Sequence, residues 1–179
     1  EGTVVLFNFS IKTSTSGLST YNSTEIPLLV RFPIAYEAQG ILHVDKVNID
    51  AGSLALADAK LFGRGNNILQ PLPQKASGTS VGLGYEQNSV QADIGMVGIG
   101  FPVSNIVGGV RHGGKFGTLS YSLNLSRRPY TGSLLSYAGA KDPATGVVWG
   151  GVTNTGLSLY LSTTLSTFNV TTNASYGLL

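Results

Sequence analysis

The stretch Leu119-Ser-Tyr-Ser-Leu-Asn-Leu-Ser126 indicates the fold class of this chain. Its apolar side chains recur at every second residue, and serine or asparagine fills the positions between them. Successive side chains of a β-strand point to opposite faces, so this period predicts a half-buried strand with one apolar and one polar face. The same alternation occurs at residues 28–34 and 157–165.

Further strand-like segments follow one another along most of the chain, at residues 41–44, 47–50, 81–85, 90–101, 107–110 and 147–152. The apolar phase changes between Met96 and Val97, as in a bulged strand, and changes again before Phe168. Residues 53–62 alone read as one or two turns of helix. About nine to eleven short strands separated by turn signals predict an all-β fold. A sandwich, a jelly roll or a closed antiparallel sheet all fit, and we expect a jelly-roll-like β-sandwich.

The composition excludes several classes of function. Charged residues make up 11% of the chain and the net charge is +2, so nothing favours nucleic acid or an anionic membrane surface as a partner. The absence of cysteine excludes disulfides and thiolate metal sites. No apolar run approaches the roughly 20 residues of a membrane-spanning helix, and we expect no membrane span. No cofactor is predicted.

Few residues could act as catalytic groups or metal ligands, and we expect that the chain is not an enzyme. His43 and Asp45 should share one face of a strand, as a catalytic or metal pair or simply as two exposed polar residues. His112 lies in a glycine-rich segment that reads as a hairpin tip. Trp149 is either core or a sugar-stacking platform. The densest group of oxygen ligands, a weak candidate for Ca²⁺, is Asp45, Asn48 and Asp50.

Two further features concern the surface and the N-terminal segment. Five Asn-x-Ser/Thr sequons predict N-glycosylation, at Asn8, Asn22, Asn124, Asn169 and Asn173. The chain begins without methionine, which suggests that a leader was removed and that the protein is extracellular, at the cell surface. The first residues then form an apolar strand that should be buried in its own sheet or in that of a neighbour.

The combination of low charge, sequons, all-β patterning and an apolar N-terminal strand resembles extracellular archaeal filament subunits. These are the bundling pili and threads related to the biofilm matrix protein TasA and, more distantly, the cannula proteins. The resemblance implies a donor strand at residues 1–13, a Ser/Thr-rich hinge at 14–24 and a β-sandwich domain at 25–179. Identical subunits would then join head to tail, the donor side chains being Val5, Phe7, Phe9 and Ile11.

Three functions therefore compete at the level of sequence. The first is a structural subunit of a filament for adhesion or biofilm formation. The second is a viral coat or fibre protein with a jelly-roll fold. The third is a secreted carbohydrate-binding module, which should display an aromatic platform. Glycans or neighbouring filaments are further candidate partners of the first.

Overall fold

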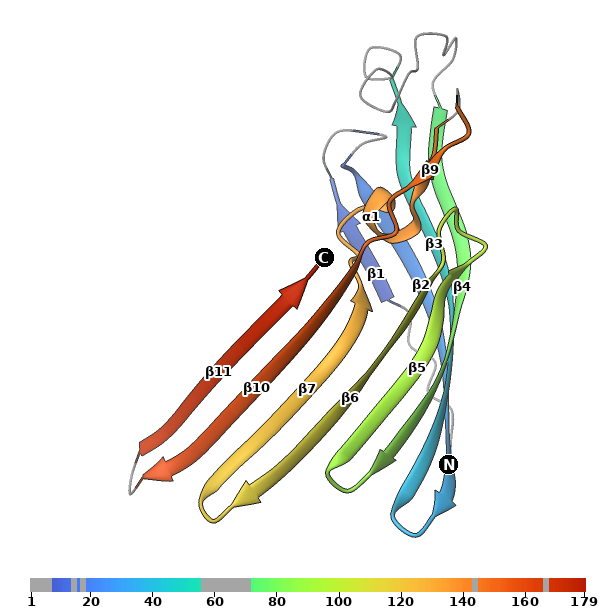
Figure 1. The fold of residues 1–179 in the computed structure, drawn as a ribbon. Helices are drawn as coiled ribbons and strands as arrows, with labels where there is room; N and C mark the ends of the chain where they lie inside the picture. The colour runs from blue at the N-terminus through green and yellow to red at the C-terminus, as the bar shows by residue number, and fades with distance from the viewer. Residues whose placement is uncertain (1–7, 14–15, 17–18, 56–71, 143–144, 166–167) are drawn as a thin grey trace.

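The computed structural model describes all residues except 1–7, 14–15, 17–18, 56–71, 143–144 and 166–167. The described residues form nine antiparallel strands of one sheet, in which neighbours in space are also successive along the chain (Figure 1). Two short strands and a helix lie between β7 and β10 in the sequence. The nine strands are β1 (Asn8–Lys12), β2 (Tyr21–Ala35), β3 (Ala38–Leu54), β4 (Leu72–Gln87), β5 (Val90–Ile99), β6 (Asn105–Phe116), β7 (Leu119–Pro129), β10 (Thr153–Leu165) and β11 (Phe168–Leu178).

Short turns and long connections lie at opposite ends of the sheet. Two residues join β2 to β3, β4 to β5 and β6 to β7. Glu37, Asn88 and Gly117 in these turns have positive φ, as tight hairpins require. At the other end, β5 reaches β6 through residues 100–104, and β7 reaches β10 through residues 130–152, which contain the remaining elements.

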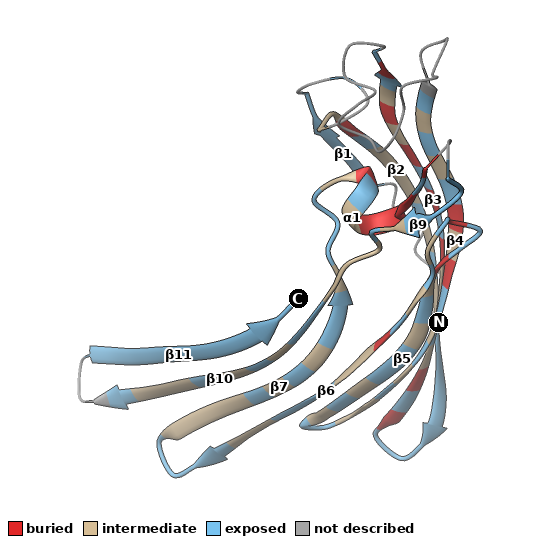
Figure 2. Cartoon of the chain, turned by 45° about the horizontal axis from the view of Figure 1, so that its top comes forward, coloured by how far each residue is buried: buried red, intermediate tan, exposed pale blue. Residues whose placement is uncertain are grey.

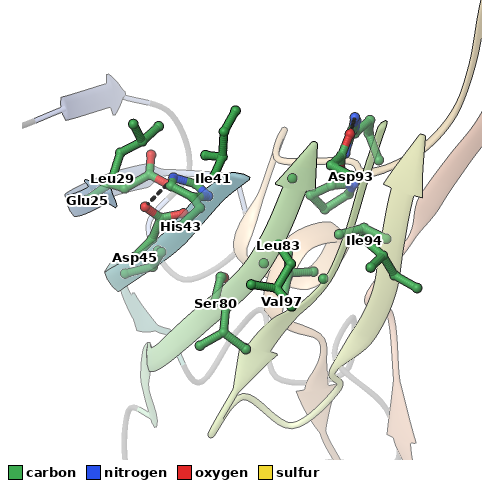
Figure 3. Close-up of a pocket in the computed structure, with 18 of the residues that line it drawn as sticks. Glu25, Leu29, Ile41, His43, Asp45, Ser80, Leu83, Asp93, Ile94 and Val97 are labelled. Carbon is green, nitrogen blue, oxygen red and sulfur yellow. Dashed lines mark hydrogen bonds and ion pairs between the residues drawn. The ribbon is translucent and has the colours of Figure 1, made fainter. Parts of the chain in front are cut away.

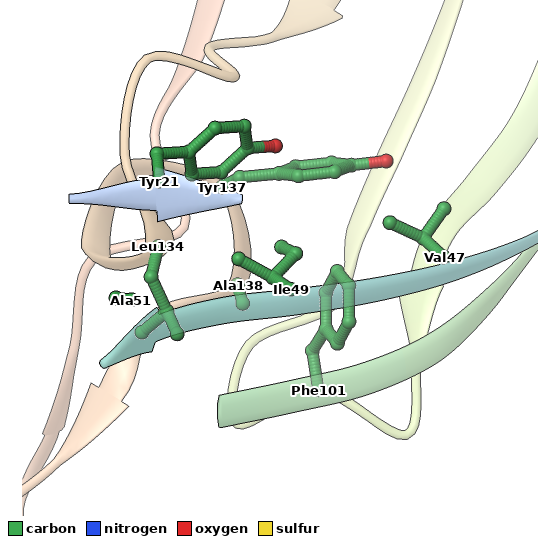
Figure 4. Close-up of a cluster of buried hydrophobic side chains, with 8 residues drawn as sticks. All are labelled: Tyr21, Val47, Ile49, Ala51, Phe101, Leu134, Tyr137 and Ala138. Carbon is green, nitrogen blue, oxygen red and sulfur yellow. The ribbon is translucent and has the colours of Figure 1, made fainter. Parts of the chain in front are cut away.

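The hydrophobic core lies where this last connection folds over one face of the sheet. Helix α1 (Leu134–Ala138) starts at Ser133, whose side chain accepts a hydrogen bond from the Ser136 backbone N–H in a capping box. The core cluster combines α1 with strands β2 and β3 and with Phe101 (Figure 4): Tyr21, Val47, Ile49, Ala51, Phe101, Leu134, Tyr137 and Ala138.

A second, smaller layer extends this cover. Strands β8 (Ala140–Lys141) and β9 (Val148–Trp149) form a two-stranded sheet. Trp149 packs against Ala140 and against Leu54 of β3. Figure 2 shows that buried residues gather on β3, β4 and α1, whereas β11 is exposed along its whole length.

The all-β prediction is confirmed. The layering is sandwich-like only in that α1 and the β8–β9 sheet cover one end of the large sheet, which is otherwise a continuous meander. The phase change in β5 is confirmed as a bulge, because Val81 pairs with Met96 while Thr79 pairs with Ile99. The phase change before Phe168 is instead a reversal of the chain between β10 and β11, in which Leu165 pairs with Phe168.

Several predicted segments fall partly outside the described residues. Residues 53 and 54 of the predicted helix belong to β3, and most of its remainder lies outside the description. Val5 and Phe7 also lie outside it. The described part of the predicted donor strand is β1, which pairs with β2 of the same chain, and residues 21–24 of the predicted hinge begin β2. Among the described residues, no helix is long and apolar enough to cross a membrane.

Candidate functional site

The two faces of the large sheet differ in chemistry, and β4 shows how. Ser80, Gly82, Gly84 and Glu86 alternate with residues 81, 83 and 85, which are valine, leucine and tyrosine. We call the face that carries Ser80 and contacts α1 the inner face, and the opposite one the outer face. Because the strands pair in register, each strand continues this division.

The outer face carries large apolar side chains that the rest of the protein leaves partly or largely exposed. Leu83 is 59% exposed, Ile94 64% and Leu125 55%. Soluble monomers rarely expose an apolar patch that extends over so many neighbouring strands. Other outer-face members exposed by more than a third include Leu28, Phe32, Leu42, Val81, Tyr85, Met96, Ile106, Val110, Leu123, Leu157, Val170 and Tyr176.

The inner face carries paired charges between neighbouring strands. Arg31 Nη1 lies 2.7 Å from Glu86 Oε2, and Gln91 Nε2 donates to Glu86 Oε1 at 3.0 Å. These hydrogen bonds, that of Arg31 first, lower the pKa of the Glu86 carboxyl. Both carboxylate oxygens of Asp93 accept from the Arg128 guanidinium, at 2.5 and 2.6 Å, and this raises the pKa of Arg128.

A groove of about 650 Å³ runs over the inner face of β2 to β5. Its floor is low where glycine replaces a side chain, as at Gly82, Gly84 and Gly95, and Tyr137 of α1 closes one side of it. Burial raises the pKa of Tyr137 to about 12, although a hydrogen bond with Ser80 lowers it. A smaller hollow of about 260 Å³ on β7, β10 and β11 adjoins the groove, since Arg128 lines both.

The predicted pair of His43 and Asp45 lies in this groove. His43 Nε2 is 2.8 Å from Asp45 Oδ1 (Figure 3). The two side chains differ in exposure: that of His43 is 45% exposed and that of Asp45 only 6%. Burial raises the pKa of Asp45, His43 opposes this shift, and the charge of Glu25 adds to it.

The structure does not bring together the oxygens of the weak Ca²⁺ candidate. Asp45 faces inward, whereas Asn48 and Asp50 stand on the opposite face because they are an odd number of residues away. Asn48 Oδ1 accepts from Ser77 Oγ at 2.8 Å, and Lys75 Nζ lies 2.8 Å from Asp50 Oδ2. Among the described side chains, no group of three or more His, Cys, Asp or Glu could hold a metal ion.

The other residues that the sequence analysis named as candidates lie within regular strands of the sheet. His112 belongs to β6 rather than to a hairpin tip, and its Nδ1 is 3.2 Å from Tyr121 Oη. Phe9 and Ile11 are 71% and 75% exposed, on strand β1. Asn8, Asn22, Asn169 and Asn173 are exposed, and Asn124 is half-buried on the inner face. Glycosylation at these five positions stays a prediction.

Sequence reasoning missed the residues that dominate the inner face. Arg31, Glu86, Asp93 and Arg128 are scattered over nearly a hundred positions, and only strand pairing brings them together. The sequence did contain one signal, because each of these four residues occupies a polar position of an alternating strand. The alternation does not show which residues of neighbouring strands pair, so it could not predict the contacts between them.

Comparison with known proteins overturns the resemblance to archaeal filaments. Residues 19–179 match the family described as cellulose synthase operon protein C C-terminus. The chain is 35% identical to cellulose synthase operon protein C of Salmonella typhimurium over 156 residues, which are 83% of this chain and 13% of the relative. The match to the Escherichia coli K12 protein has the same figures.

A third relative, from Xanthomonas axonopodis, is 47% identical over 89 residues, which are 49% of this chain and 6% of the relative. The chain thus spans only a small part of these relatives. The predicted archaeal pilus subunit, its head-to-tail polymer and its adhesive function are wrong, because general features of exported β-proteins carried that resemblance and no specific motif did. Over residues 19–179 the chain belongs to the family of the C-terminal region of cellulose synthase operon protein C.

Proposed function

We propose that this chain is a membrane-embedded wall of a cellulose-export machine, with its outer face in lipid and its inner face along the path of the polymer. The observation that carries the proposal is the contrast between the two faces. The link to cellulose rests on the family, whose relatives are named for the cellulose synthase operon, and the export role is our inference. We infer a lining role and no catalysis.

The outer face fits a hydrocarbon environment. Tilted strands need about 9–11 residues to cross a bilayer, and β5, β6 and β7 have 10, 12 and 11. Apolar-out, polar-in alternation with short turns at one end is the pattern of membrane-spanning antiparallel sheets. The expectation of no membrane span considered helices alone. In lipid, the free edges of β1 and β11 would have to pair with further strands.

The inner face fits a neutral, hydroxyl-rich polymer. Two of its ion pairs, Arg31 with Glu86 and Arg128 with Asp93, hold opposite charges side by side, so the field of each of these charges is largely cancelled by its partner. Serine, asparagine and glycine occupy much of the rest, for example Ser126, Asn154 and Gly156 along the smaller hollow. Such a surface offers hydrogen bonds without attracting a polyelectrolyte.

Cysteine scanning tests the orientation of the sheet. The chain has no cysteine of its own, so single changes at residues 122 to 125 add one thiol each to it. In cells or proteoliposomes, Leu123→Cys and Leu125→Cys should react with a membrane-partitioning maleimide, and Ser122→Cys and Asn124→Cys with a charged, water-soluble one. Labelling without alternation would overturn the proposed membrane placement.

A pair of neighbouring tryptophan substitutions tests the path. Gly82→Trp fills the floor of the groove, where an added Cβ meets no atom closer than 3.5 Å, so the backbone need not move. Leu42→Trp on β3 places the same ring on the outer face, at a residue that does not line the groove. Cellulose accumulating outside cells should fall several-fold for Gly82→Trp at equal protein level and stay unchanged for Leu42→Trp. Equal export by both variants would exclude the groove as the path.

A further inference from the structure

One end of the groove gathers acidic and hydroxyl groups from four elements. Glu25 comes from β2, His43 and Asp45 from β3, Ser80 from β4 and Tyr137 from α1. Asp45 pairs with Ser80 across β3 and β4, and His43 pairs with Gly82, which has no side chain to cover the imidazole. Figure 3 shows Glu25, His43 and Asp45 close together on β2 and β3.

The Asp45 carboxylate is short of hydrogen-bond donors. Its side chain is 94% buried, yet Oδ1 makes no hydrogen bond of normal geometry. His43 Nε2 lies at ion-pair distance from that oxygen without the alignment of a hydrogen bond. Buried acceptors are almost always satisfied by a donor, so this oxygen can accept a hydrogen bond from a group that enters the groove.

Two cations of the inner face are engaged elsewhere. Arg31 binds Glu86, and Arg128 binds Asp93 through two hydrogen bonds. The charged or titratable groups that act on Asp45 are His43 and Glu25, and Tyr21 and Tyr137 complete the polar surroundings. Two carboxylates, which can only accept hydrogen bonds when ionised, therefore face the groove beside the hydroxyl groups of Tyr21 and Tyr137.

We propose that Asp45, His43 and Glu25 form a sugar-binding subsite that holds one glucose unit of a β-glucan chain by its hydroxyl groups. Vicinal hydroxyls donate to carboxylate oxygens in short, charge-assisted bonds and bring no charge of their own. The half-exposed imidazole supplies a further donor or acceptor at the mouth of the subsite. This subsite rests on the proposed export function, because it assumes that a glucan enters the groove.

The test uses the protein reconstituted in lipid nanodiscs, with cellohexaose as the probe. Calorimetry should show binding that weakens about tenfold for Asp45→Asn and several-fold for Glu25→Gln. Asp50→Asn on the outer face is the matched control and should bind as the wild type does. Thermal unfolding of each variant checks the fold, and His43→Gln provides a second variant should Asp45→Asn be unstable.

Three outcomes would overturn the subsite. The first is that the wild type does not bind cellohexaose, and the second is that folded Asp45→Asn binds it equally well. The third is that Asp45→Asn and Glu25→Gln weaken the binding of Ca²⁺ but not that of cellohexaose, which would indicate a cation site. The tryptophan pair at residues 82 and 42 separates the two proposals. If Gly82→Trp blocks export while Asp45→Asn leaves cellohexaose binding intact, the export path stands and the subsite is wrong.

Discussion

The end of the sheet under α1 and the end formed by β10 and β11 share one sequence pattern but differ in what covers them. Under α1, Val47 and Ile49 on the inner face are each 2% exposed. On β11 every residue is exposed, including Val170 at 48% and Tyr176 at 69%. Strand alternation thus creates two different faces everywhere, and packing against other protein atoms stabilises only one end. The apolar side chains of the end formed by β10 and β11 can be shielded from water only by molecules outside this chain.

Truncation of a core residue should give the largest contrast between the two ends. Ile49→Ala leaves a cavity beneath α1 and should lower the free energy of unfolding by about 2–5 kcal/mol. Val170→Ala on β11 removes a side chain that touches little protein, and in detergent it should cost less than about 1 kcal/mol. Denaturant unfolding followed by Trp149 fluorescence measures both. Equal losses would show that β11 is packed as tightly as the core.

A charge on the outer face should cost nearly as much, but only in lipid. Leu125→Arg places a guanidinium in the hydrocarbon region and should lower stability in vesicles by about 2–4 kcal/mol. The neighbouring Asn124→Arg points to the polar inner face and should change stability by less than about 1 kcal/mol. Unfolding by urea in phospholipid vesicles compares the two variants. A penalty of the same size at both positions would contradict the assignment of faces.

The attachment of α1 gives a smaller effect. Gly150 has a φ of +89°, and an added Cβ would lie 2.2 Å from the carbonyl oxygen of Leu135. Gly150→Ala should therefore cost at least about 1–3 kcal/mol and loosen the cover of the core. Gly117→Ala is the control, because φ there is +58° but no atom lies within 4 Å of the added Cβ. A smaller loss at residue 150 than at residue 117 would show that α1 shifts without cost.

The pH dependence of the Asp45 contribution should be the smallest of these effects. Its pKa is raised in the folded state, so the folded protein binds more protons than the unfolded chain between pH 3.8 and the raised value. The contribution of Asp45 to stability therefore increases as the pH falls from neutrality through that window. Asp45→Asn should remove this increase, measured as the difference between variant and wild-type melting temperatures at pH 7 and pH 4. A difference independent of pH would contradict the raised pKa.

Much of the sheet could be predicted from sequence, because period-two alternation follows directly from strand geometry. Leu123, Asn124 and Leu125 fall on the faces that the pattern assigns to them. Whether protein or lipid covers the apolar face could not be predicted from the sequence, because a leucine side chain is shielded from water equally well by either. Helix α1 was missed because five residues carry too short a period to stand out, and its contact with β3 spans more than eighty positions.

The order of the strands has a consequence for how such a sheet forms and changes. Because each strand pairs with its neighbours in sequence, β2–β3, β4–β5, β6–β7 and β10–β11 are hairpins with local contacts. Local contacts close short loops and favour fast, stepwise assembly. Adding or removing one hairpin preserves strand direction and leaves every short turn on the same side. The sheet can therefore widen or narrow by pairs of strands without inverting any remaining face.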